Sequence, residues 1–116
     1  MEDDSGAPVG TTDETQPEEE HKKKLEFFLT MLDDDNEAVR WKAAESLGRL
    51  GDPAAVDSLI DMLWDDDARV RIKAAWALGK IGDLKALRPL QQLYRIENEN
   101  VREIIEKAMD ELKRHD

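Results

Sequence analysis

The sequence matches itself when it is shifted by 31 residues, and this internal repeat constrains the fold more than any other feature. Val39-Arg40 recurs as Val70-Arg71 and again as Val101-Arg102, and Lys42-Ala43-Ala44 recurs as Lys73-Ala74-Ala75. A repeat of this length is typical of solenoids, in which each unit is a small supersecondary element that stacks on its neighbours. We therefore expect three units, which cover about residues 17–51, 52–82 and 83–114.

Each unit carries the pattern of two amphipathic helices, which we call A and B. The apolar residues of the first A helix, between Leu25 and Leu32, are spaced three and four apart, as one face of a helix requires. An Asn or Asp that can cap each B helix precedes it. These caps are Asn36, Asp67 and Asn98. Gly51 and Gly82 suit a left-handed stop at the ends of the first two B helices. The sequence thus predicts an all-α fold, an α–α superhelix of three helical hairpins with about six helices.

Composition and charge limit the possible functions. The formal net charge is -11, and eight of the 28 acidic residues lie in residues 1–20, which hold no Lys or Arg. We interpret residues 1–15 as an acidic disordered N-terminal arm and residues 16–116 as the repeat domain. An acidic balance argues against nucleic acid as a partner, because nucleic-acid binding requires clustered basic residues. With no cysteine, no secretory pattern and no apolar run of ~20 residues, we expect a cytoplasmic protein without a membrane partner.

The segments Asp65–Asp83 (DDDARVRIKAAWALGKIGD) and Val39–Asp52 resemble HEAT repeats, and most closely the subfamily of PBS-lyase HEAT-like repeats. The resemblance implies a right-handed solenoid whose B helices line the concave side and which binds other proteins. In related repeats an Asp also pairs with the Arg that follows the Val, in a ladder between units. Asp34 with Arg40 and Asp65 with Arg71 match this pattern, whereas Ile96 interrupts it before Arg102.

Two glycines inside the B helices predict how the repeats stack. Gly48 and Gly79 each cost their helix ~1 kcal/mol compared with alanine, so we expect the backbone of the next repeat to approach closely there. On the same arc of its B helix, the third unit has Glu106 and Asp110. Terminal repeats need such a polar outer face, so we expect the array to end with this unit. Pro89 lies within the third A helix, where we expect a loose first turn rather than a break.

A helical wheel leaves part of the B helices outside the packing arcs, and this part is the candidate partner-binding surface. The candidate residues are Trp76, Lys73, Lys80, Lys42, Glu45, Arg49 and Trp41. Trp76 is either an exposed anchor for a partner or a ring folded over Ile72 and the adjacent B helix. For Trp41 we favour packing between repeats, and for Trp64 both a covered repeat junction and exposure stay open. Phe27 lies opposite the apolar stripe of its helix, where it contacts the N-terminal arm, a partner or a second copy, or is a single exposed aromatic.

Nothing in the sequence supports catalysis or a cofactor. The two histidines, His21 and His115, have no partner at the spacing of a catalytic motif, and the Asp33–Asp35 and Asp65–Asp67 triplets lack the Gly and Glu of a calcium loop. We therefore predict a non-enzymatic scaffold without cofactors, a monomer rather than a homodimer, whose concave B-helix face binds a partner protein or peptide. The alternative, implied by the resemblance alone, is an accessory or chaperone-like subunit of a cofactor-modifying, bilin-lyase-like enzyme.

Overall fold

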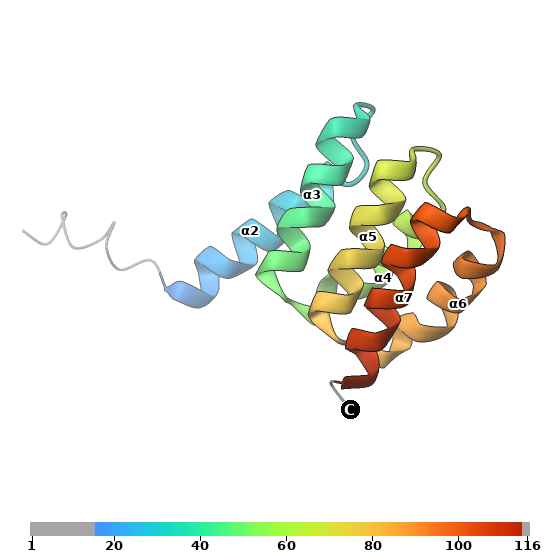
Figure 1. The fold of residues 1–116 in the computed structure, drawn as a ribbon. Helices are drawn as coiled ribbons and strands as arrows, with labels where there is room; N and C mark the ends of the chain where they lie inside the picture. Colours follow the sequence, from blue (N-terminus) through green and yellow to red (C-terminus); the bar gives the residue numbers. More distant parts are fainter. Residues whose placement is uncertain (1–15, 115–116) are drawn as a thin grey trace, which may run out of the picture.

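The computed structural model describes residues 16–114, and within this range the chain forms three helical hairpins without any strand (Figure 1). The predicted arm at residues 1–15 lies outside the described residues. The first hairpin consists of α2 (Pro17–Met31) and α3 (Glu37–Leu50). In the second, η1 (Pro53–Ala55), α4 (Val56–Asp61) and η2 (Met62–Trp64) form the A side, and α5 (Ala68–Ile81) is the B helix. The third hairpin consists of η3 (Leu84–Ala86), α6 (Leu87–Ile96) and α7 (Glu99–Arg114). The predicted all-α fold with about six helices is confirmed.

The B helices begin and end where their capping residues predict. The side chains of Asn36, Asp67 and Asn98 accept backbone N–H bonds of 2.8, 2.8 and 3.1 Å at the starts of α3, α5 and α7. At the ends of α3 and α5, Gly51 and Gly82 have φ values of 75° and 83°, in the left-handed region that favours glycine. Local side-chain chemistry therefore fixes the length of these helices.

Pro89 does not break the third A helix. It is the third residue of α6, where the backbone N–H has no partner within the helix in any case. The separate turn η3 precedes α6, and the carboxylate of Asp83 caps this turn by accepting the N–H of Lys85 at 2.9 Å. The loose first turn expected before Pro89 is therefore present as η3.

The three B helices lie side by side and carry most of the contacts between repeats, α3 against α5 and α5 against α7 (Figure 1). Among the described residues, the core contains only apolar side chains. The largest fully buried ones are Leu32, Leu47, Leu59, Leu63, Leu78, Leu90, Leu93, Ile105, Leu112, Val56 and Val70. No helix between residues 16 and 114 is long and apolar enough to cross a membrane.

Two glycines bring the B helices into direct backbone contact. A Cβ atom on Gly48 would lie 2.9 Å from the Cα of Ala77, and one on Gly79 would lie 2.9 Å from the Cα of Ala108. Contacts this short do not occur with real Cβ atoms, so the predicted close approach is confirmed. The third unit has the exposed Asp110 in the equivalent position of α7.

Candidate partner-binding surface

The seven candidate residues lie on two neighbouring helices, α3 and α5. We call them the B-helix strip: Trp41, Lys42, Glu45, Arg49, Lys73, Trp76 and Lys80. The side chains of Lys42, Arg49 and Lys80 are exposed, and the other four are half-buried. The structure thus brings the candidates together on one layer of the molecule, where the exposed members are all basic.

Lys73 lies between the two tryptophans of the strip. Its ammonium group is 5.6 Å from the ring centroid of Trp41 and 5.6 Å from that of Trp76, and it forms an ion pair of 3.2 Å with Glu45. Because Lys73 belongs to α5 and Trp41 to α3, this cluster spans the junction between two repeats, which agrees with the packing that we favoured for Trp41. The indole N–H of Trp41 is buried and has no hydrogen-bond partner among the described residues.

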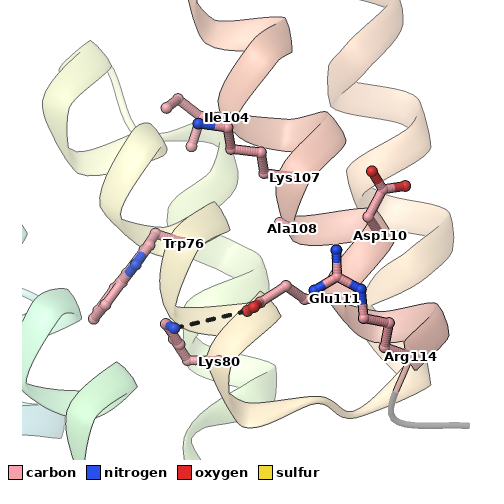
Figure 2. A pocket seen from close by; sticks show the side chains of 8 residues that line it. All are labelled: Trp76, Lys80, Ile104, Lys107, Ala108, Asp110, Glu111 and Arg114. Carbon is pink, nitrogen blue, oxygen red and sulfur yellow. Dashed lines mark ion pairs between the residues drawn. The ribbon is translucent and has the colours of Figure 1, made fainter.

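Trp76 is not a freely exposed anchor. Its ring atom Cζ3 lies 2.7 Å from the place where a Cβ on Gly48 would stand, so the ring packs on the helix of the preceding repeat. Figure 2 shows the ring turned away from α7. The packing against the adjacent B helix, one of the two interpretations of Trp76, is thus present, while the side chain stays half-buried. Gly48 has no side chain, and this leaves the space that the ring of Trp76 occupies. The helical wheel predicted only a backbone contact at Gly48.

A cavity of about 510 Å³ lies between α5 and α7, next to Trp76 (Figure 2). We call it the α5–α7 hollow. Its lining residues are Trp76, Lys80, Ile104, Lys107, Ala108, Asp110, Glu111 and Arg114. Lys80 and Glu111 approach each other to 4.0 Å and connect its two sides.

The α7 side of this hollow is absent from the candidates predicted from the sequence. Ile104, Lys107 and Glu111 lie 31 residues after Lys73, Trp76 and Lys80. The repeat therefore contained the signal that could have found them, although the third unit has lost the glycines that make the first two units easy to align.

An arginine ladder joins the loops of successive repeats at one edge of the B helices. Arg40 donates from Nε and Nη2 to the carboxylate of Asp65 at 2.9 and 3.1 Å, and from Nη1 to the carbonyl of Asp34 at 2.8 Å. Arg71 donates to the carboxylate of Glu97 at 2.6 Å and to the carbonyl of Asp65 at 2.7 Å. A ladder between units is therefore present, but each arginine pairs with a carboxylate of the following unit. In the third unit that carboxylate belongs to Glu97.

The ladder changes the acidity of its central carboxyl group. Burial raises the pKa of Asp65, but hydrogen bonds from Arg40 and from the N–H of Asp67 outweigh this effect and hold its pKa below the ordinary value. Arg102 donates to the carbonyls of Tyr94 and Arg95 instead of a carboxylate. The ladder thus stabilises the two inner junctions and stops at Arg102.

Two further carboxyl groups cap turns or helices. The N–H of Ala54 and the ring of His21, which is 2.7 Å away, lower the pKa of Asp52. A side-chain hydrogen bond from Arg69 lowers the pKa of Asp67. Within residues 16–114, no three His, Asp or Glu side chains form a set that could hold a metal ion. Because each accepts a backbone N–H two residues further along, we assign Asp52 and Asp67 to capping.

Two aromatic side chains outside the strip are exposed. Trp64 ends η2 and is 46% exposed, and Phe27 on α2 is 59% exposed. The ring of Phe27 contacts Phe28 edge to face, with centroids 5.5 Å apart. The question of packing or exposure, which the sequence left open for Trp64, is thus decided in favour of exposure, and Phe27 lies off the apolar stripe of α2 as the sequence predicts.

Comparison with known proteins agrees with the repeat and the stacked hairpins. The sequence pattern that describes HEAT repeats matches residues 25–110, most of the length of the chain. A search of curated proteins finds no match to the sequence. The matched range begins within α2 and ends within α7, so it includes all three hairpins. This chain belongs to the HEAT repeat family.

Proposed function

We propose that the chain is a non-enzymatic interaction scaffold that binds an acidic segment of a partner protein along the B-helix strip and the α5–α7 hollow. HEAT repeats generally mediate contacts between proteins. The same proposal places the protein in the cytoplasm as a monomer, with neither nucleic acid nor a membrane as its partner. It also assigns the repeats to the PBS-lyase HEAT-like subfamily, because Val39–Asp52 and Val70–Asp83 resemble that subfamily.

A concentration of basic side chains on an acidic protein carries the proposal. The whole chain has a net charge of -11, yet the B-helix strip and the hollow together hold twice as many basic as acidic side chains. The basic ones are Lys42, Arg49, Lys73, Lys80, Lys107 and Arg114. A surface of one sign accelerates the encounter with a partner of the opposite sign and disfavours partners of the same sign.

The hollow offers a place for an apolar side chain within this basic surface. Trp76, Ile104 and Ala108 contribute apolar groups to its lining, while Lys80 and Lys107 supply charge beside them. An apolar centre with a polar rim is the usual arrangement of a protein interface. The strip and the hollow therefore suit a segment that combines acidic residues with one apolar anchor.

The alternative of an accessory subunit for a cofactor-modifying enzyme is less well supported. Pockets for small organic ligands are lined mainly by apolar and aromatic side chains. Five of the eight residues that line the hollow are charged. We therefore prefer a protein partner to a small-molecule one at this site.

Affinity capture from a nuclease-treated native lysate tests the proposal. The intact chain is compared with Lys80→Glu/Lys107→Glu, which reverses charge at the hollow, and with Lys23→Glu/Lys24→Glu, which makes the same change on exposed positions of α2. We expect the wild type and the α2 variant to recover the same acidic partners, and the hollow variant to lose them. Recovery should also fall as salt is added, because salt screens exposed charges.

The choice of variant follows from the packing of Trp76. A Trp76→Ala change would remove the ring that covers Gly48 and would weaken the fold together with any binding. Charge reversal at exposed lysines avoids this ambiguity, and circular dichroism checks that both double variants remain folded. Equal recovery of partners by the two double variants would contradict the proposal.

A further inference from the structure

The outer side of the first repeat carries a second surface with a different chemistry. A groove of about 220 Å³ opens between α2 and α3 and is almost entirely apolar. Its lining residues are Phe27, Phe28, Met31, Val39, Lys42, Ala43 and Ser46. Apart from Lys42, it shares no residue with the B-helix strip or the α5–α7 hollow. We call it the α2–α3 groove.

The other repeats show what covers this face when it is occupied. Ser46 corresponds to Ala77 in the second unit and to Ala108 in the third, 31 residues further along each time. Ala77 packs against Gly48 of the preceding B helix, and Ala108 packs against Gly79. The α2–α3 groove is therefore the continuation, at the first repeat, of the two junctions that the chain builds between its own repeats.

The exposure of equivalent residues supports this comparison. Val70 is fully buried and Val101 is 3% exposed, whereas Val39 is only half-buried. In the same way, Leu59 is fully buried, while Phe28 at the equivalent position of α2 is half-buried. Within residues 16–114, nothing covers the first repeat in the way that the preceding repeat covers the second and the third.

We infer that the α2–α3 groove binds one α-helix of a partner protein, and that this helix carries a glycine where it crosses Ser46. This inference goes beyond the proposed function of the B-helix strip. A helix that enters a groove with an apolar face is an established mode of recognition. Here the two inner junctions define its geometry, because both bring a glycine against the position that Ser46 occupies.

A folded second copy of the chain does not offer such a helix. The glycine faces of α3 and α5 are buried in the two inner junctions. In α7 the equivalent position is the exposed Asp110, with Glu103 and Glu106 on the same outer side. Close approach of this charged face to an apolar groove would leave carboxylates without water, which is unfavourable. Among the described residues no helix is free to fill the groove, so the occupant that we infer is a helix of a different protein.

The probe for this site is a synthetic peptide with the sequence of residues 36–51, which contains α3 and its capping residues. Its glycine face is the one that packs on Ala77 in the second repeat, so it should also fit over Ser46. Isolated helices of this length are marginal in water, so a lactam bridge on the far side of the peptide holds it helical. Its binding to the full chain is measured by calorimetry, and the groove is located by NMR shifts of Phe27 and Ser46.

Three matched changes define the expected result. Ser46→Glu in the full chain should weaken binding at least tenfold, ~1.4 kcal/mol, because it places a charge in the groove. Gly48→Leu in the peptide should weaken binding by a similar factor, although leucine favours helix more than glycine does. Lys80→Glu in the full chain, at the α5–α7 hollow, should leave the affinity within about twofold, well below that tenfold scale. Melting temperatures confirm that the protein variants are folded.

Two results would overturn the inference. One is equal binding of the peptide by the wild type and by Ser46→Glu, or no binding at all to the wild type. The other is a dimer of the full chain in sedimentation that Ser46→Glu dissociates, because the groove would then belong to a second copy. Neither result depends on whether Lys80 and Lys107 bind an acidic partner, so this test and that of the proposed function fail independently.

Discussion

The two outer faces of the array, on the first and on the third repeat, have opposite chemistry. On the first repeat, the half-buried Val39 and Ser46 of α3 line an apolar groove beside the exposed Phe27. On the third repeat, Glu106 and Asp110 of α7 face outward and are exposed. Between these faces, the two inner junctions have glycine where α7 has Asp110. The residue at this one position thus distinguishes a B helix that another helix covers from one that solvent covers.

This difference shows how a short solenoid specifies its own order. Backbone contact at Gly48 and Gly79 leaves no room for a side chain, so only a helix with glycine there can accept the next repeat. Asp110 prevents the same contact on α7 by its size and by the cost of burying its charge. The two ends of the array therefore differ: the outer face of α7 disfavours packing of a further helix, whereas the α2–α3 groove can accept one.

The largest effect is expected for Gly79→Leu. The new side chain would collide with the backbone of Ala108, and overpacking of this kind costs up to ~3 kcal/mol, more than the helix propensity that leucine adds. The matched change Asp110→Leu, at the equivalent position of α7, should alter the free energy of unfolding by less than ~0.5 kcal/mol, as is usual at the surface. Urea unfolding of both variants measures the contrast. A similar loss in the two variants would mean that the two positions are equally packed.

Ala75→Leu should have the next largest effect, ~2 kcal/mol, because Ala75 is fully buried in a well-packed region between helices. Its counterpart in the third unit is the exposed Glu106, where Glu106→Leu should leave the melting temperature nearly unchanged. A thermal melt in which Ala75→Leu causes no loss of stability would contradict the stacking at this position.

The sequence predicts those parts of the fold that depend on local chemistry and on the repeat. Capping at Asn36, Asp67 and Asn98 and the left-handed turn at Gly51 follow from side chains within a few residues of each feature. The close contact at Gly48 is predictable because a glycine inside a helix is destabilising. Its recurrence at the same repeat position, as Gly79, indicates that close packing compensates for this cost. In the second A helix, the division into α4 and two 3₁₀ turns has no comparable signal in the sequence.

The contacts of the candidate surface were harder to predict, because its side chains pack against residues that are distant in the sequence. Trp76 turns towards Gly48, and a helical wheel shows the direction of a Cβ atom but not the path of a ring. Arg40 reaches Asp65 across the junction, a pairing that the family resemblance implied only in general form. To predict that Lys107 lines the surface, the third repeat must be aligned with the other two, and this alignment is difficult because the third repeat lacks their glycines.

The arginine ladder distinguishes the inner junctions from the outer end of the array by a smaller, pH-dependent effect on stability. Asp65→Asn removes the carboxylate that Arg40 binds in the neighbouring unit, so it should destabilise at pH 7 by less than Ala75→Leu does. The pKa of Asp65 is lower in the folded state than its ordinary value of ~3.9. Its contribution is therefore complete above that value and is lost as the pH falls through the folded-state pKa.

Urea unfolding of the wild type and of Asp65→Asn at pH 7 and pH 3 measures this effect. The difference between the two proteins should shrink at the lower pH, because the unfolded wild type takes up a proton at Asp65 that the lowered pKa of the folded state resists. Asp66→Asn is the control, since its carboxylate also lies 3.2 Å from Arg40 but is 92% exposed, and solvent screens it. A difference that is the same at both pH values would show that charge is not what holds the ladder together.

The smallest effect is expected for Phe27→Ala, on the receptive end of the array. Phe27 is 59% exposed and loses mainly its edge-to-face contact with Phe28, so the cost should be ~0.5 kcal/mol, at the low end for aromatic pairs. Phe28→Ala should cost ~2 kcal/mol, because Phe28 packs against the core from the same helix. Thermal melts of the two variants compare these losses. If they were equal, Phe27 would have to be covered in solution, and the first repeat would not present the open apolar face that distinguishes it from the third.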